Sequence, residues 1–128
     1  MKAVLLLAHG SREDATEKTL EKIVGYIREE LASETEKEDF IIEEAYLQFR
    51  NKNLGSVLES LCERGADDIA VIPYFLFEGV HIKEDIPGEI KEFTDIHSNV
   101  RVSLGRTLGS DRRLAMIAAD NVRELIKT

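Results

Sequence analysis

One stretch of the sequence decides the fold: Lys2-Ala3-Val4-Leu5-Leu6-Leu7-Ala8, followed at once by His9-Gly10-Ser11-Arg12. A short aliphatic run with a single charge is typical of a strand that is buried on both faces. Helical spacing of apolar residues begins just after the turn, so the strand leads directly into a helix. That strand-helix unit is the repeating element of parallel α/β sheets.

Three further runs have the same apolar character. Phe40 to Phe49 is rich in β-branched and aromatic residues and predicts a second strand. Asp68 to Leu76 is continuously apolar after its first residue, which favours a strand in the middle of a parallel sheet. Val100 to Leu104 predicts a short fourth strand.

Helical patterns follow the first two strands. Glu13 to Ser33 has apolar residues at a period of about 3.6 and predicts the first helix. A second helix carries Leu54 to Cys62 and is expected to end at Gly65, the residue type that most often terminates a helix. Glu34 to Asp39 is a charged connector between the first helix and the second strand.

The two later helices are less alike. The pattern from Ile86 to Phe93 is short, and Pro87 predicts that this helix starts close to it, because proline is tolerated in the first turn. A last helix, capped by Ser110 or Asp111, has a clear apolar face. Its apolar residues are Leu114, Ile117, Ala118, Val122, Leu125 and Ile126.

Four strand-helix units in strict alternation predict an α/β fold with a single four-stranded parallel sheet flanked by helices. We expect the 128 residues to form one domain, 1–128, because the sequence has no internal repeat and no linker. A sheet this small leaves two edges that must be covered, charged or paired with another subunit. A homodimer is therefore a reasonable expectation.

Composition narrows the class of function. The net charge of −8 argues against nucleic acid, which needs a basic surface, and favours metal cations as ligands. The apolar run near residue 1 is too short for a signal peptide or a membrane span, so we expect no membrane partner. Cys62 is the single cysteine and cannot form an internal disulfide, which indicates a reducing compartment, the cytoplasm. We expect it to be a small buried residue.

Two of the three histidines follow predicted strands. His9 comes directly after the first strand, and His81 follows the third after Phe77, Glu78, Gly79 and Val80. Ligands of open parallel sheets bind at the carboxyl ends of the strands, so both imidazoles are placed at the functional edge. Imidazoles with nearby carboxylates and no cysteine cluster favour a divalent transition metal held without great tightness. His97 precedes the fourth strand, at the opposite end, and is expected at the surface.

The segments around these histidines suggest binding functions as well. The His9 turn precedes a helix, whose N-H groups and dipole favour an anion. The segment Pro73-Tyr74-Phe75-Leu76-Phe77-Glu78-Gly79-Val80-His81 offers an apolar wall that could accept a large flat ring system, with core packing as the alternative for Tyr74 and Phe75.

These motifs together resemble the short-form sirohydrochlorin chelatases of the CbiX type, small members of the class II tetrapyrrole chelatases. The matching stretches run in family order over nearly the whole chain. They are Leu7-Ala8-His9-Gly10-Ser11-Arg12, Ala45-Tyr46-Leu47, Val71-Ile72-Pro73-Tyr74-Phe75-Leu76 with Gly79 and His81, Asp85-Ile86-Pro87, and Leu108-Gly109.

The resemblance implies insertion of a divalent metal into sirohydrochlorin without ATP, in cobalamin or related tetrapyrrole synthesis, and one chelatase-like lobe. It implies that His9 and His81 are metal ligands and catalytic residues, with His9 also resembling the proton acceptor. An unperturbed imidazole titrates near pH 6.5 and can hold either a metal or a proton, so we expect the two roles to alternate or divide between them. The substrate-binding residues are expected to be Arg12, Gln48, Tyr74, Phe75, Leu76, Phe77, Glu78, Gly79 and Val80.

The chain departs from the family at Gln48, where a glutamate is usual, because an amide cannot ionise. Glu44, Glu78, Glu84 and Asp85 remain as candidate acids, each with a solvated surface position as the alternative. A substrate with eight carboxylates would be repelled by an acidic protein. We therefore expect a cationic rim, formed by Arg12, Arg50, Lys52 and Lys83.

Two other functions compete with metal insertion. Phosphate transfer through His9, as in phosphoglycerate mutase-like proteins, would place an arginine before the histidine, where this chain has Ala8. A non-catalytic carrier of metal or tetrapyrrole would use the same histidines, and the sequence separates it poorly from a chelatase. No permanently bound cofactor is expected. We rank cobalt(II) first and nickel(II) close behind as the substrate metal, and a homodimer would restore the cleft that larger relatives form between two lobes.

Overall fold

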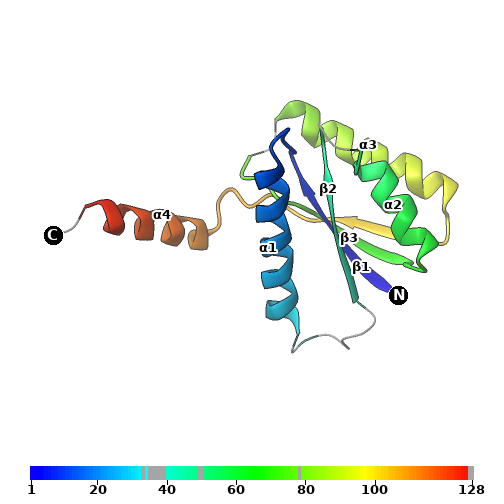
Figure 1. The fold of residues 1–128 in the computed structure, drawn as a ribbon. Helices are drawn as coiled ribbons and strands as arrows, with labels where there is room; N and C mark the ends of the chain where they lie inside the picture. Colours follow the sequence, from blue (N-terminus) through cyan, green and yellow to red (C-terminus); the bar gives the residue numbers. More distant parts are fainter. Residues whose placement is uncertain (33, 35–39, 49–50, 78, 127–128) are drawn as a thin grey trace.

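The computed structural model describes residues 1–32, 34, 40–48, 51–77 and 79–126. Its elements alternate as predicted. They are β1 (Lys2–Ala8), α1 (Asp14–Leu31), β2 (Phe40–Tyr46), α2 (Leu54–Glu63), β3 (Asp68–Pro73), α3 (Val80–Ile96), β4 (Arg101–Leu104) and α4 (Arg112–Leu125). Figure 1 shows the sheet with α1 on one face and α2 and α3 on the other, while α4 projects away from the body.

The four strands form one parallel sheet in the order β2-β1-β3-β4, which confirms the predicted fold class. All carboxyl ends therefore lie at one edge of the sheet. β1 is internal, and Leu5, Leu6 and Leu7 are fully buried, as expected for a strand covered on both faces. The order also places the ends of β1, β2 and β3 side by side.

The core has two layers. On the α2–α3 face, Leu5 and Leu7 pack with Val71 and with the apolar residues of both helices. On the α1 face, Leu6 and Tyr46 pack with Leu20 in a smaller cluster. Among the described residues, no helix is both long and apolar enough to cross a membrane.

Two strand ends differ from the prediction. β2 ends at Tyr46, and Phe49 lies outside the described residues. β3 ends at Pro73, because proline has no N-H group to continue the ladder. Tyr74 still donates a backbone hydrogen bond to the Leu7 carbonyl, at 2.7 Å.

The expected helix ends are confirmed for α2 and α4. Gly65 follows α2 with a positive φ of 97°, and Ala66 N-H donates to the Leu61 carbonyl at 3.0 Å. Asp111 is the N-cap of α4 and accepts a hydrogen bond from Arg113 N-H at 2.9 Å.

The prediction for α3 was wrong at its start. The helix begins at Val80 and not near Pro87, which lies inside it. Proline inside a helix removes one hydrogen bond, but Ile82, Ile86 and Phe93 recur at helical spacing and pack into the core. That burial outweighs the lost bond, and His81 becomes part of the first turn of α3.

Candidate active site

The turn after β1 brings Gln48 next to His9. The pairing of β1 with β2 continues beyond the strands, because Leu47 N-H donates to the Ala8 carbonyl at 2.9 Å and Gln48 N-H donates to the His9 carbonyl at 3.1 Å. Gly10 has a φ of 92°, and a Cβ atom there would lie 2.2 Å from the Gln48 carbonyl oxygen. Only glycine fits this close approach. The end of β2 and the residues just after it therefore lie directly against the backbone of Gly10.

The imidazole of His9 rests on the ring of Phe75, which follows β3. The ring centroids are 4.7 Å apart and the planes are inclined by 39°. Phe75 is buried, whereas His9 is exposed. A buried aromatic ring therefore supports an imidazole that faces solvent at the carboxyl edge of the sheet.

A pocket of about 340 Å³ lies on the α3 side of His9. Two acidic side chains of α3, Asp85 and Glu89, line it together with His9 and Gln48. Its apolar lining consists of Leu47, Ile82 and Ile86. An imidazole, two carboxyl groups and an amide therefore share one small cavity, and these are ligand types that divalent transition metals accept.

Burial raises the pKa of Glu89, and the negative charges of Glu92 and Asp85 raise it further. A carboxyl group with a raised pKa in a pocket takes up a proton more readily than a free one. Sequence analysis named Asp85 as a candidate acid but missed Glu89. A signal was available, because Asp85 and Glu89 are four residues apart and therefore lie on one side of a helix. It was overlooked because the predicted helix began only near Pro87.

His81 is the second residue of α3, and the structure describes it only as part of that helix. Its predicted pairing with His9 therefore stays a prediction. Glu78 lies outside the described residues, and Val80 is described only through its helical backbone. Gly79 is the N-cap of α3, with a φ of −81° that any residue can adopt.

The predicted apolar wall is divided between core and surface. Phe75 is buried and Tyr74 is half-buried, but Leu76 and Phe77 are 45% and 76% exposed. Leu76 and Phe77 follow β3, at the same edge of the sheet as His9. Two large apolar side chains are therefore exposed at the edge of the sheet where His9 lies.

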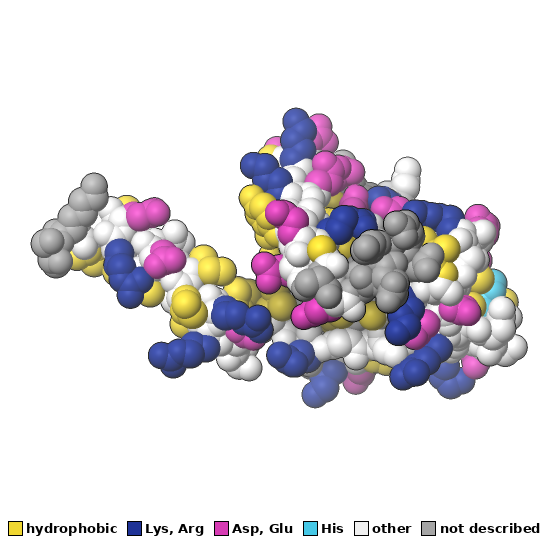
Figure 2. Space-filling view, turned by 90° about the horizontal axis from the view of Figure 1, so that it is seen from below, with side chains coloured by type: hydrophobic (Ala, Val, Ile, Leu, Met, Phe, Trp, Pro, Cys, Tyr) yellow, Lys and Arg dark blue, Asp and Glu magenta, His cyan; other side chains and the backbone are white. Residues whose placement is uncertain are grey.

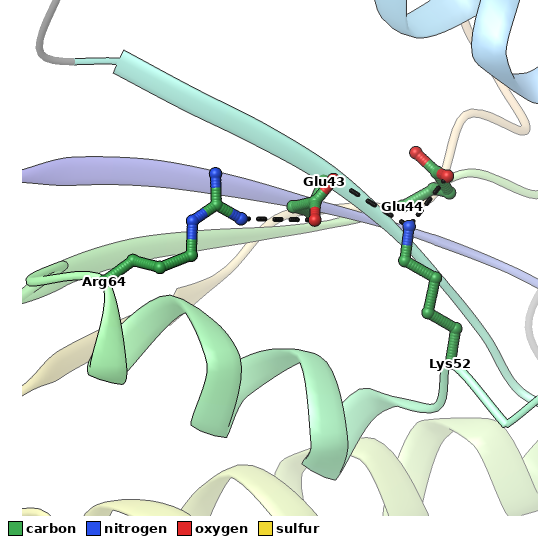
Figure 3. Close-up of polar contacts among 4 residues, drawn as sticks. All are labelled: Glu43, Glu44, Lys52 and Arg64. Carbon is green, nitrogen blue, oxygen red and sulfur yellow. Dashed lines mark hydrogen bonds and ion pairs between the residues drawn. The ribbon is translucent and has the colours of Figure 1, made fainter.

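Lys52, expected in the cationic rim, is held by acidic groups of the protein itself. Its Nζ atom lies 2.9 Å from Glu44 and 3.8 Å from Glu43, and Arg64 also pairs with Glu43 at 3.2 Å (Figure 3). Burial alone would lower the pKa of Lys52, but the hydrogen bond and the charges of Glu44 and Glu43 raise it overall. Lys52 therefore serves to neutralise Glu44, which is buried.

Two of the other predicted cations, Arg12 and Lys83, are exposed and do not line the pocket. Arg50 lies outside the described residues. The first turn of α1 already contains Asp14 and Glu17, so an anion near the His9 turn would meet negative charge. Glu84 is exposed, as its surface alternative implied.

His97 and Cys62 lie together at the other end of the sheet. His97 is half-buried, stacks on Phe93 with centroids 4.4 Å apart, and contacts Glu59 at 2.9 Å. Cys62 is half-buried against the core, with its Sγ atom 3.8 Å from His97 Nδ1. His97 thus joins α2 to α3, and the expectation of a simple surface position was too coarse.

A model of the CbiX family matches residues 3–125. The chain belongs to the CbiX family. The resemblance that the sequence motifs carried is thereby confirmed over almost the full length.

Curated relatives of this CbiX chain include chelatases of two sizes. A sirohydrochlorin cobaltochelatase of Methanopyrus kandleri is 27% identical, over 98% of this chain and 98% of the relative. A sirohydrochlorin ferrochelatase of Priestia megaterium is 29% identical, over 97% of this chain but only 44% of the relative. The CbiX chain therefore matches the small relative as a whole and less than half of the larger one.

Solved structures agree with this CbiX fold. A protein described as a cobalamin (vitamin B12) biosynthesis CbiX protein, from Marinobacter aquaeolei, is 27% identical with a TM-score of 0.72, over 97% of this chain and 96% of that chain. The structure of SirB from Bacillus subtilis with Fe³⁺ is 25% identical with a TM-score of 0.72, over 97% of this chain and 47% of that chain. This chain therefore matches less than half of the larger structure.

Proposed function

We propose that this protein inserts a divalent metal ion into sirohydrochlorin without ATP. The family match and the names of the relatives support this activity. The observation that carries it is the pocket at the carboxyl edge, where His9, Asp85 and Glu89 face the same cavity. These side chains supply the three functions that metallation needs: attraction of a cation, loose coordination and acceptance of protons.

The reaction exchanges one divalent cation for two protons. The metal sheds water and enters the ring, while two pyrrole N-H protons leave. The carboxyl groups of Asp85 and Glu89 attract the cation, and the imidazole of His9 either coordinates it or accepts a proton. One nitrogen cannot do both at the same time, so we propose that His9 and His81 divide or alternate these roles.

The apolar residues beside His9 are proposed to hold the tetrapyrrole ring. Leu76 and Phe77 are exposed at this edge and offer flat apolar surface. Gln48 is exposed in the pocket and can donate a hydrogen bond to a carboxylate of the substrate. The proposed binding surface is completed by Arg12, Tyr74, Phe75, Glu78, Gly79 and Val80.

The metal is proposed to be cobalt(II) first and nickel(II) second, within cobalamin or related tetrapyrrole synthesis. Small relatives are named cobaltochelatases, and larger ones include ferrochelatases. Imidazole and carboxylate ligands accept both cobalt and nickel, and copper and zinc often bind such sites more tightly. We also propose a homodimer and, from the single cysteine, a cytoplasmic location.

The test is anaerobic absorbance of sirohydrochlorin with excess cobalt(II), nickel(II) or iron(II) and substoichiometric protein. We expect conversion of the spectrum over many turnovers, fastest with cobalt. His9→Ala and His81→Ala should lower kcat/KM at least 100-fold. Asp85→Asn with Glu89→Gln should raise the KM for the metal, because two charges that attract the cation are lost.

His97→Ala is the matched control, because it removes an imidazole at the opposite end of the sheet. It should leave kcat/KM within a few-fold once the folded fraction is taken into account. Binding of metal or tetrapyrrole without turnover would support a carrier instead. If neither metal nor tetrapyrrole binds, the chelatase and the carrier are both contradicted. Phosphate transfer by His9 then becomes the hypothesis to test.

A further inference from the structure

Arginines gather around β4 in an otherwise acidic chain. Residues 98–119 contain four arginines and one acid, whereas the whole chain has 17 basic and 25 acidic residues. Arg101 begins β4, and the other three, at positions 106, 112 and 113, follow its end. Figure 2 shows Lys and Arg side chains where the projecting helix joins the body. Three of the four arginines therefore come after the strand at its carboxyl end, the edge of the sheet that carries the candidate active site.

The segment that holds Arg106 is fixed to the neighbouring strand. Before it, Gly105 N-H donates to the Val71 carbonyl at 2.8 Å, and after it, Leu108 N-H donates to the Phe75 carbonyl at 3.1 Å. The backbone is thus held on both sides of Arg106. A binding group on such a backbone loses less conformational freedom when a ligand arrives.

This segment also borders the apolar surface that is proposed to hold the tetrapyrrole ring. A Cβ atom at Gly109 would lie 2.3 Å from the Leu76 carbonyl oxygen and 3.8 Å from Cδ1 of Phe77. Leu76 and Phe77 are the two exposed apolar side chains that follow β3. A flat ligand that rests on them has its rim beside the residues that follow β4.

The separation from His9 suits the rim of the substrate and not its centre. Only β3 lies between β1, which ends before His9, and β4. Neighbouring strands are about 4.8 Å apart, so the residues after β1 and β4 are separated by about 10 Å. The nitrogens that receive the metal are at the centre of the ring, and the carboxylates are at the ends of its side arms. With the ring nitrogens beside His9, Arg106 is placed to meet an arm.

Of the three arginines after β4, Arg106 is the one that faces a pocket without an ion-pair partner. A pocket of about 270 Å³ is lined by Arg106, Thr107, Asp111 and Arg113, among others. Arg113 donates two hydrogen bonds to the Asp111 carboxylate, at 2.8 and 2.6 Å. Among the acids that the structure describes, none forms an ion pair with Arg106. Arg112 lines a different pocket, on another side of α4.

The pairing of Asp111 with Arg113 is stable to changes in pH. The hydrogen bonds from Arg113 hold the pKa of Asp111 well below its ordinary value, and the charge of Arg106 adds a smaller effect. Asp111 therefore stays ionised and keeps Arg113 occupied. The positive charge that remains in this pocket is that of Arg106.

We propose that Arg106, assisted by the hydroxyl group of Thr107, binds a carboxylate arm of the tetrapyrrole substrate. This inference rests on the proposed function, because it assigns a contact with the same substrate. A guanidinium group is always charged and can donate two parallel hydrogen bonds to one carboxylate. Arg106 thus offers the substrate a positive charge that Lys52 does not, since Lys52 is paired with Glu44.

Arg106 is expected to act on binding and not on the chemical step. The arm that it holds is remote from the pyrrole nitrogens, so the contact is equally strong before and during metal insertion. Loss of an interaction of this kind raises KM and leaves kcat unchanged. A group that acted on the metal or on a proton would lower kcat.

The first experiment measures the Kd of metal-free sirohydrochlorin by absorbance titration at about 150 mM salt, where charge repulsion is screened beyond about 8 Å. Arg106→Met should raise this Kd about tenfold, because a charge-assisted hydrogen bond is lost, and Arg106→Lys should give an intermediate value. Arg101→Met is the matched control, because Arg101 is an exposed arginine at the opposite end of β4. It should change the Kd less than about twofold.

The second experiment separates charge from packing. The octamethyl ester of sirohydrochlorin has the same ring without the negative charges, and it is titrated in the same co-solvent as the free acid. Arg106→Met should leave the Kd of the ester unchanged. In turnover with cobalt(II), the same variant should raise the KM for sirohydrochlorin about tenfold at constant kcat. Circular dichroism and urea denaturation check that each variant is folded.

Three results would overturn the role of Arg106. One is an equal Kd for Arg106→Met and Arg101→Met. Another is an equal loss of affinity for the acid and the ester. The third is a lower kcat at unchanged KM. If the wild type still turns over, each of these leaves the proposed function standing. A wild type that binds no sirohydrochlorin would overturn both.

Discussion

Gly10 holds the active-site turn through a contact that no other residue allows. A side chain there would collide with the Gln48 carbonyl, and its φ of 92° is unfavourable for any residue with a Cβ atom. We expect Gly10→Ala to lower the free energy of unfolding by at least about 2 kcal/mol, as measured by urea denaturation. Gly25→Ala is the control, because its Cβ meets nothing within 4 Å inside α1, and should stabilise by about 0.5–1 kcal/mol. Equal effects would contradict the close approach.

Lys52 should matter for stability because it neutralises a buried carboxylate. Lys52→Met leaves Glu44 without its partner at 2.9 Å. Since the lysine side chain is 39% exposed, we expect a moderate loss, about 1–2 kcal/mol. Adding Glu44→Gln removes the uncompensated charge and should restore most of it, which a double-mutant cycle by denaturation measures. Additive losses would show that the two groups act separately.

Glu89 gives a pH-dependent prediction. Its pKa is raised above the ordinary value of 4.5 in the folded state, so the folded protein binds this proton more tightly than the unfolded chain does. Ionisation of Glu89 therefore disfavours folding as the pH rises through the raised pKa. We expect Glu89→Gln to increase the free energy of unfolding at pH 7, by less than about 1 kcal/mol because the site is partly solvated.

The comparison that tests this is urea denaturation at several pH values. The gain should disappear well below pH 4.5, the ordinary pKa of the group, where Glu89 is protonated in both states. A gain that is constant with pH would mean that the glutamine acts through packing and not through charge.

Among the elements, α3 is the one whose sequence signals conflict. Pro87 inside it cannot donate to the carbonyl of Lys83, four residues earlier. We expect Pro87→Ala to restore this bond and to raise the free energy of unfolding by about 1–2 kcal/mol. Glu92→Ala, at an exposed position of the same helix, should change it by less than about 0.5 kcal/mol. A destabilised Pro87→Ala would indicate that the proline shapes the packing of α3.

The conflict between Pro87 and the apolar pattern of α3 also explains which parts of the fold and of the candidate site the sequence could predict. Apolar runs such as Ala3 to Ala8 identify strands, because an internal parallel strand is covered on both faces, and the order of units then places His9 at the carboxyl edge. The start of α3 could not be predicted, because burial of Ile82 and Ile86 outweighs the preference of proline for the first turn of a helix. Glu89 was missed for that reason.

The direction in which α4 projects could not be predicted either, but for a different reason. Its apolar face was visible in the sequence, but an apolar face does not say which surface it covers. The backbone hydrogen bonds that fix the segment before α4 join residues more than 30 positions apart, such as Gly105 and Val71. Periodicity along the chain carries no information about such contacts.

At the scale of the whole molecule, charge opposes the proposed substrate. The chain has a net charge of −8, and Lys52 is already occupied by Glu44 and Glu43. We therefore expect the association rate of sirohydrochlorin to rise when ionic strength increases from 10 to 150 mM, because the Debye length falls from about 30 to about 8 Å. Stopped-flow absorbance measures this rate. An association rate that falls as the salt concentration rises would instead support the predicted cationic rim.

The sheet separates the two ends of the molecule by what each must satisfy. The pocket with His9 lies at the carboxyl edge, whereas the contact of His97 with Glu59 lies at the other end. Substitutions at the amino end of the sheet are therefore selected for stability alone, while those at the carboxyl edge must also preserve the candidate site. Over evolutionary time the two ends of this chain are free to diverge at different rates.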